Sequence, residues 1–264
     1  LFMGAGPFLS WKRADLAGVL QRVRFVAGLA VLVTLAVWYL ISGGPFLAYV
    51  SILIAVWLLL ATLREWALRI KFMEAPLSET LRRARNLPRA SQGMTLAHVG
   101  LAVAMIGMIG SSAWKSEEIV FVTPGTDVTI AGFDVTFTGA ERLRGPNYIA
   151  DRGRLEVRRD GEPVTTLYPE RRSYPVAQST TTESAIRSTL AGDLYASISE
   201  PASEDAASGE AWTLRILYEP LVNFIWLGAL MLVAGGALSL SDRRLRVGVP
   251  RRTRPHGDLR LPAE

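Results

Sequence analysis

The sequence predicts a membrane α-helical protein with four transmembrane helices and an exported all-β domain inserted between the third and fourth helices. Three observations support this prediction. Half of the 264 residues are hydrophobic, and they are concentrated in four long apolar segments. Lysine and arginine gather in the segments that flank these apolar stretches. The region between the third and fourth apolar segments shows the two-residue alternation that is typical of β-strands.

The apolar segments are long enough to cross a bilayer. A helix needs roughly 20 apolar residues to span about 30 Å of hydrocarbon, and each segment comes close to that length. The segments cover residues 23–41, 45–63, 94–113 and 220–240. Only "SGGP" separates the first two, so we expect them to form an antiparallel hairpin.

The distribution of charge predicts the orientation. Basic residues are frequent before the first span, between the second and third, and after the fourth, whereas the short connection at 42–44 has none. Because basic loops stay on the cytoplasmic side, we expect both ends of this segment to be cytoplasmic and residues 114–219 to lie on the outer side of the membrane. The basic runs adjoin membrane helices, which favours contact with anionic headgroups over nucleic-acid binding.

The exported region predicts a small antiparallel barrel or sandwich. Its expected strands are 118–122, 127–132, 133–140, 154–160, 163–169, 193–200 and 212–218. We expect residues 181–192 to form one short helix and residues 201–210 to form a polar loop. The chain then divides into an N-terminal part, the β domain, a last helix and a basic tail, at 1–113, 114–219, 220–240 and 241–264.

The chain contains no cysteine. Disulfides, thiolate metal sites and covalent c-type haem attachment within this chain are therefore excluded. The sequence begins with leucine and carries no signal-peptide pattern at its start. We expect it to be a piece of a longer protein or the product of a split gene.

The third apolar segment contains a histidine, His98, in the stretch "GMTLAHVGLAV" at 93–103. At 100° per residue, Gly93, Gly100 and Gly107 lie on one line, which predicts close packing against another helix. His98 lies on the opposite side of the helix. Its neighbours there are apolar: Met94, Leu101, Ala102, Met105 and Ile109.

An ionisable residue inside a membrane is a candidate functional residue. His98 could make an interhelical hydrogen bond or stay hydrated near the headgroups, it could ligate a haem iron, or it could relay protons. The residues alone leave these alternatives open. The other histidine, His256, lies in the polar stretch "RTRPHGD", where we expect it to be solvated. A haem with two histidine ligands would therefore need its second ligand from outside this chain.

Six stretches together, in order and over nearly the whole chain, resemble the C-terminal part of the CcmF family of cytochrome c-type biogenesis proteins, which includes NrfE. They are "MGAGPFLSW" (3–11), "SQGMTLAHVGLAV" (91–103), "GPNYIADRGRLEV" (145–157), "LYPERRSYP" (167–175), "DLYASISE" (193–200) and "EPLVNFIWLGALMLVAGGALSLSDRRLR" (219–246).

The resemblance implies a haem lyase subunit of System I cytochrome c maturation. Proteins of this family receive haem from the chaperone CcmE and work with CcmH and CcmI to attach it to apocytochrome c. The family's "GMxLAHxG" histidine is an axial ligand of a transmembrane b-type haem, and it corresponds to His98. The cofactor implied is thus haem b, with its second axial ligand supplied by the remainder of CcmF. No catalytic residue is assigned to this chain.

The chain departs from the family pattern in two respects. It has no tryptophan-rich WWD segment and no candidate for the family's other three functional histidines. We therefore expect it not to catalyse haem ligation alone. The rival hypotheses are a non-redox assembly subunit whose outer domain docks haem chaperone or apocytochrome, and a b-haem quinol oxidoreductase, which would require a paired histidine that this chain lacks.

Several other side chains are candidates for partner or haem-propionate contacts, or for turn chemistry, ion pairs and packing. In the outer domain they are Asn147, Tyr148, Arg171, Arg172 and Tyr174. Trp114 and Trp226 are candidates for interface anchoring or helix packing.

Overall fold

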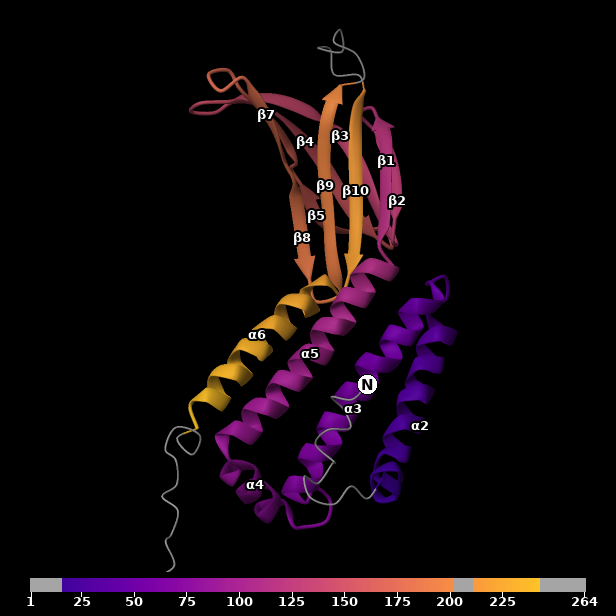
Figure 1. Ribbon diagram of the computed structural model, residues 1–264. Helices are drawn as coiled ribbons and strands as arrows, with labels where there is room; N and C mark the ends of the chain where they lie inside the picture. The colour runs from indigo at the N-terminus through magenta and orange to yellow at the C-terminus, as the bar shows by residue number, and fades with distance from the viewer. Residues whose placement is uncertain (1–15, 202–210, 243–264) are drawn as a thin grey trace, which may run out of the picture.

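The structure is a computed structural model, which describes residues 16–201 and 211–242. A bundle of apolar helices stands below a β-sandwich, and the chain passes from helices to strands and back to a final helix (Figure 1). The bundle contains α2 (Leu16–Leu40), α3 (Phe46–Ile70), α5 (Arg89–Ala113) and α6 (Val222–Leu240). The β-domain candidates and His98 therefore lie in different layers of the molecule.

The predicted hairpin of α2 and α3 is confirmed. The Tyr49 hydroxyl donates to the carbonyl of Ile41 at 2.8 Å and accepts from the backbone N–H of Gly44 at 3.3 Å. One side chain thus satisfies backbone groups at the end of α2 and in the turn, which a buried helix end requires.

Three of the helices in the described part of the chain, α3, α5 and α6, are long and apolar enough to cross a membrane. In α2 the described apolar stretch is shorter, Arg24–Leu40. The expected fourth span over 23–41 therefore stays a prediction. Three helices exceed their predicted bounds, since α2 begins at Leu16, α3 continues past residue 63 to Ile70, and α5 begins at Arg89.

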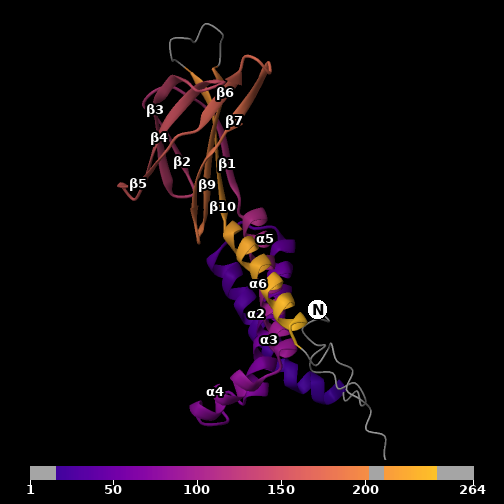
Figure 2. The same cartoon turned by 90° about the vertical axis from the view of Figure 1, so that its left-hand side faces the viewer.

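The basic connection between the second and third predicted spans contains a helix that the sequence analysis missed, α4 (Leu77–Asn86). It projects sideways from the foot of the bundle (Figure 2). Glu79 pairs with Arg82 and Arg83 one turn later, at 2.5 and 2.8 Å. The hydrogen bond from Arg82 and the charges of both arginines hold the pKa of Glu79 below its usual range.

In the described part of the domain, ten strands pair antiparallel in two sheets, which decides between the predicted barrel and sandwich in favour of a sandwich. The first sheet has the order β1-β10-β9-β8, with bounds Ser116–Val122, Trp212–Pro220, Gly192–Pro201 and Ala185–Thr189. The second has the order β2-β3-β4-β6-β7, with bounds Thr126–Ile130, Phe133–Arg144, Ile149–Arg159, Glu170–Tyr174 and Ser179–Glu183. Strand β5, Glu162–Leu167, pairs with β4.

The sandwich core is built from the alternate residues of facing strands. Phe137 and Leu155 from the second sheet pack with Ile198, Leu214 and Ile216 from the first, and all five are fully buried. Burial of such side chains contributes about 1.5–3 kcal/mol each relative to leaving them exposed. The alternation that predicted these strands is therefore the alternation that builds the core.

The predicted helix over 181–192 is wrong, because these residues form strands β7 and β8 and the turn before β9. Thr180, Thr181 and Thr182 are β-branched and favour strands. Ile186 and Leu190, which would have anchored a helix face, are exposed. Strand β6 is a further element that the sequence analysis did not predict.

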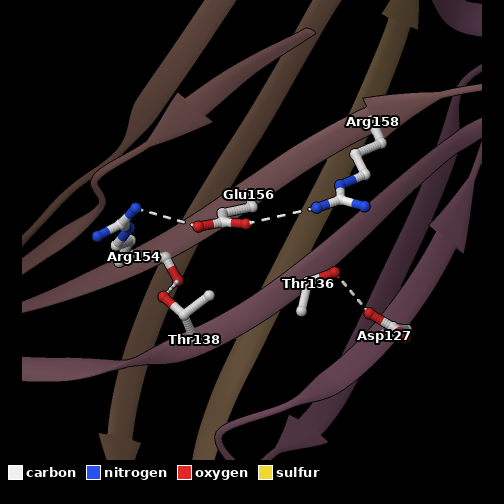
Figure 3. Close-up of polar contacts among 6 residues, drawn as sticks. All are labelled: Asp127, Thr136, Thr138, Arg154, Glu156 and Arg158. Atoms are coloured by element: carbon white, nitrogen blue, oxygen red, sulfur yellow. Dashed lines mark hydrogen bonds and ion pairs between the residues drawn. The ribbon is translucent and has the colours of Figure 1, made fainter. Parts of the chain in front are cut away.

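The solvent face of the second sheet is polar (Figure 3). Glu156 accepts from Arg154 at 3.0 Å and lies 4.0 Å from Arg158. On the neighbouring strands the hydroxyl of Thr136 donates to Asp127 at 2.5 Å. Such exposed pairs add little to stability. The polar residues of this face are the outward-pointing half of the strand alternation.

Candidate functional site

Helix α5 packs on α6 through glycines, as the glycine line predicted. A Cβ built on Gly100 would lie 2.8 Å from the carbonyl oxygen of Gly228, and one built on Gly107 would lie 2.6 Å from the backbone nitrogen of Ile225. Gly93 meets Gly235 in the same way. The two backbones are in direct contact, which is the usual use of small residues between membrane helices.

The opposite face of α5 packs on α3. Ser91 accepts a hydrogen bond from Arg69 of α3 at 2.5 Å, and Ile109 packs against a cluster on α3 that includes Tyr49. His98 comes seven residues after Ser91 and eleven before Ile109, which at 100° per residue places all three within about 20° of one another. His98 therefore lies on the α3-facing side of α5, between two points of contact.

The ring of His98 is held by its own helix. Its Nδ1 lies 2.8 Å from the carbonyl oxygen of Met94, one turn earlier. A carbonyl can only accept, so Nδ1 carries a proton, and in the tautomer protonated at Nδ1 alone the lone pair of Nε2 is available. Among the residues that the structure describes, none hydrogen-bonds to Nε2. Histidine metal ligands show this arrangement, with one ring nitrogen bonded to a carbonyl and the other available to the metal.

The donor set around His98 does not suit a bare metal ion. In the described ranges, no group of three or more His, Asp or Glu side chains comes together. One imidazole can serve as an axial ligand where a macrocycle supplies the four equatorial nitrogens, and a half-buried position in an apolar helix suits such a group. The residues present fit haem, and they provide one ligand.

Sequence reasoning missed the polar groups near the C-terminal end of α3. The predicted second span ended at residue 63, so Glu65 and Arg69 were placed outside the membrane helix. In the structure both belong to α3, and Glu65 is buried, with 6% of its surface exposed, and pairs with Arg69. Thr62 is buried on the same face. A glutamate amid "LLLATLREWALRI" was the available signal.

The two candidate tryptophans have different surroundings. Trp114 follows α5 and packs edge-on against Tyr49 with ring centroids 5.8 Å apart. Its ring lies so close to Gly44 that a Cβ there would come within 2.6 Å. It also lines an apolar cleft of about 580 Å³ between the helices and the base of the sandwich. Trp226 on α6 is mostly exposed. Trp114 is therefore a packing residue, and Trp226 faces away from the described contacts.

Three of the five β-domain candidates form one cluster. The guanidinium carbon of Arg172 lies 4.6 Å from the ring centre of Tyr148, and the rings of Tyr148 and Tyr174 are 5.7 Å apart. Arg172 also donates to Glu170 at 2.8 Å. The motifs "GPNYIA" and "PERRSYP" are thus neighbours in space because β4 pairs with β6.

Glu170 is the buried centre of this cluster. It accepts from both Arg152, at 2.6 Å, and Arg172. Burial alone raises the pKa of Glu170, but the hydrogen bonds from Arg172 and Arg152 outweigh it, and the pKa lies below its usual range. The hydrogen bond to Glu170 in turn raises the pKa of Arg172. The pairing accounts for these charges without a ligand.

The remaining candidates lie elsewhere. Arg171 points to the other side of β6, where it lies 4.0 Å from Asp151. Asn147 is exposed in the turn between β3 and β4. His256 and the basic tail fall outside the described residues.

Comparison with known proteins adds to this geometry. Residues 113–220 match the family described as the CcmF C-terminal beta-sandwich. The cytochrome c-type biogenesis protein CycK of Rhizobium meliloti is 39% identical over 97% of the chain, and CcmF of Pseudomonas aeruginosa is 35% identical over 96%. This chain belongs to the CcmF family. It spans 38% of the length of CycK and 37% of the length of that CcmF.

A solved structure supports the CcmF fold. The cytochrome c haem lyase CcmF superposes with a TM-score of 0.63 over 90% of this chain and 37% of its own, at 18% identity. The apolar helices and the β-sandwich are therefore those of a CcmF fold. The "GMTLAHVG" stretch lies in α5, directly before the matched sandwich.

Proposed function

We propose that this chain is part of a CcmF-type haem lyase subunit of System I cytochrome c maturation, and that His98 is an axial ligand of a transmembrane b-type haem. The observation that supports the ligand assignment is the hydrogen bond of Nδ1 to the Met94 carbonyl, which leaves Nε2 free. A haem bound there would supply one-electron chemistry, which keeps the iron of an incoming haem reduced for attachment.

The residues of the chain have distinct parts in this proposal. The Met94 carbonyl fixes the ring of His98 and makes its imidazole a better donor. The glycine contacts fix α5 on α6, so that the position of His98 follows from the packing of the helices. The second axial ligand and the site that presents substrate haem are assigned to the remainder of CcmF.

The proposed surroundings follow from the charge distribution and the family. The helices span a bacterial inner membrane, with both ends of this segment cytoplasmic and the β-sandwich in the periplasm. The proposed partners are the remainder of CcmF, CcmH, CcmI, the haem chaperone CcmE and apocytochrome c. Nucleic acid is not among them.

The test is the haem content of the full-length protein with His98→Ala. The chain offers a matched control, His256→Ala, which removes the other histidine. We expect His98→Ala to lose most of the b-type absorbance at an unchanged protein level, and His256→Ala to keep it. Full b-type absorbance in His98→Ala would sink the ligand assignment.

The alternative function, a non-redox assembly subunit, has one observation in its favour. The outer face of the first sheet exposes the apolar side chains of Ile119 and Phe121 on its edge strand β1. Exposed apolar patches mark interaction sites. If this alternative holds, Phe121→Ser should weaken co-purification of a partner without loss of haem. The alternative also requires that His98→Ala leaves the haem content unchanged.

A further inference from the structure

The first turn of α5 is fastened by four neighbours in succession. Three of the ties are hydrogen bonds, and the fourth is the glycine contact. They join Ala90 N–H to Asp242 at 3.0 Å, Arg69 to Ser91 at 2.5 Å, the Gln92 amide to the carbonyl of Ala84 at 2.8 Å, and Gly93 to Gly235. The end of α6, α3 and α4 thus all hold the segment that leads to His98.

One of these ties contains charged groups inside an apolar helix. Glu65 is 6% exposed and pairs with Arg69 one turn later, and Arg69 reaches across to Ser91 of α5. A buried charge without its partner costs several kcal/mol. The contact of Gln92 with α4 contains no charged group, since the neutral Gln92 amide donates to the backbone carbonyl of Ala84.

The pair lies near the level of His98. Helices α3 and α5 are antiparallel neighbours (Figure 1), and contacts at both ends relate their residues, Arg69 with Ser91 and Tyr49 with Trp114. Moving seven residues along α5 from Ser91 to His98 corresponds to moving about seven residues back along α3 from Arg69, to the turn between residues 62 and 65. Glu65 is therefore within about one turn, roughly 5 Å, of the His98 level, and Arg69 is a turn further away.

We propose that the Glu65–Arg69 pair is a positioning and tuning element for the haem ligand His98. Arg69 holds α5 at a fixed rotation against α3, and the carboxylate of Glu65, the nearer charge, sets the local electrostatic field. The proposal rests on the proposed function, because it presupposes a haem on His98. It goes further in assigning two residues of α3 that no motif marks.

The effect of these charges on the reduction potential of a haem bound to His98 has a predictable sign. Oxidised haem iron carries one more positive charge than reduced iron, so a nearby negative charge favours oxidised iron and lowers the reduction potential. Neutralising Glu65 leaves the cation of Arg69 uncompensated and raises the potential. Neutralising Arg69 leaves the anion and lowers it. A contact that only holds the helices together predicts no opposite shifts.

The experiment is a redox titration of the full-length, haem-loaded protein in detergent. We expect Glu65→Gln to shift the midpoint potential upward and Arg69→Gln to shift it downward. The matched control is the exposed pair on α4, where Glu79→Gln and Arg82→Gln should leave the potential at the wild-type value, because those groups are solvated and screened.

A charge-swapped variant, Glu65→Arg with Arg69→Glu, keeps the proposal testable if a single variant does not fold. It retains a pair and the net charge, but it places the cation nearer to His98, so we expect an upward shift. Wild-type potentials in the variants that load haem, or shifts of one sign in both single variants, overturn the inference. A wild-type protein without haem instead contradicts the proposed function.

Discussion

The glycine contact between α5 and α6 makes a quantitative prediction for Gly228→Ala. The added methyl group would lie 2.5 Å from the carbonyl oxygen of Gly100 and 2.7 Å from the Cβ of Ala104. Favourable carbon contacts need about 3.5–4.0 Å, so the helices must separate by roughly 1 Å. Gly236, on the same helix, has nothing within 4 Å of its added Cβ and provides the control.

The comparison isolates packing from helix propensity. Alanine in place of glycine favours a helix by about 1 kcal/mol at either position, and this gain cancels between the two variants. Overpacking costs about 1–3 kcal/mol. Gly228→Ala should therefore be less stable than Gly236→Ala by that amount, which is roughly 5- to 150-fold in the unfolding equilibrium. Equilibrium unfolding in mixed micelles measures it, and equal stability of the two variants would refute the close-packing argument.

The remaining predictions concern the ends of α5 and the sandwich. Asp242→Ala removes the acceptor for the N–H of Ala90, so we expect a loss of about 0.5–2 kcal/mol in unfolding free energy, against a smaller loss for Ser241→Ala, whose hydroxyl bonds within its own helix. Because the pKa of Glu170 is lowered in the folded chain, its contribution is complete above the ordinary glutamate range and is lost as the pH falls through the lowered pKa. Thermal unfolding between neutral and acid pH should show this loss of stability in wild type and a smaller loss in Glu170→Gln. The control variant Glu162→Gln, at an exposed position, should behave as wild type. An unchanged acid dependence in Glu170→Gln would contradict the role assigned to Glu170.

Regular spacing of apolar residues, or of glycines, predicted the strands and the helix contact in which those residues are buried. Alternation in "VTIAGFDVTF" predicted strands because every second residue enters the sandwich core. The seven-residue spacing of glycines predicted the α5–α6 contact because seven residues nearly complete two turns. These patterns report local geometry, which the tertiary structure preserves.

The failures occurred where the partner in space decides the structure. Residues 181–192 show no apolar–polar alternation in the sequence, and in the structure they form strands β7 and β8 by pairing with β6 and β9. The predicted second span ended at residue 63, and Glu65 fell outside it, because charge normally ends an apolar segment. In the structure Glu65 is buried and pairs with Arg69, which donates to Ser91 on another helix, and no local pattern in the sequence contains that contact.

The assignment of His98 as a haem ligand through Nε2 is tested most directly by imidazole rescue. The measurement is the absorption spectrum of the haem-loaded full-length protein with His98→Gly, which removes the ring but leaves space for a free imidazole. The assignment predicts loss of the six-coordinate low-spin spectrum in His98→Gly and its return on addition of imidazole. An unchanged low-spin spectrum in His98→Gly before any imidazole is added would contradict it.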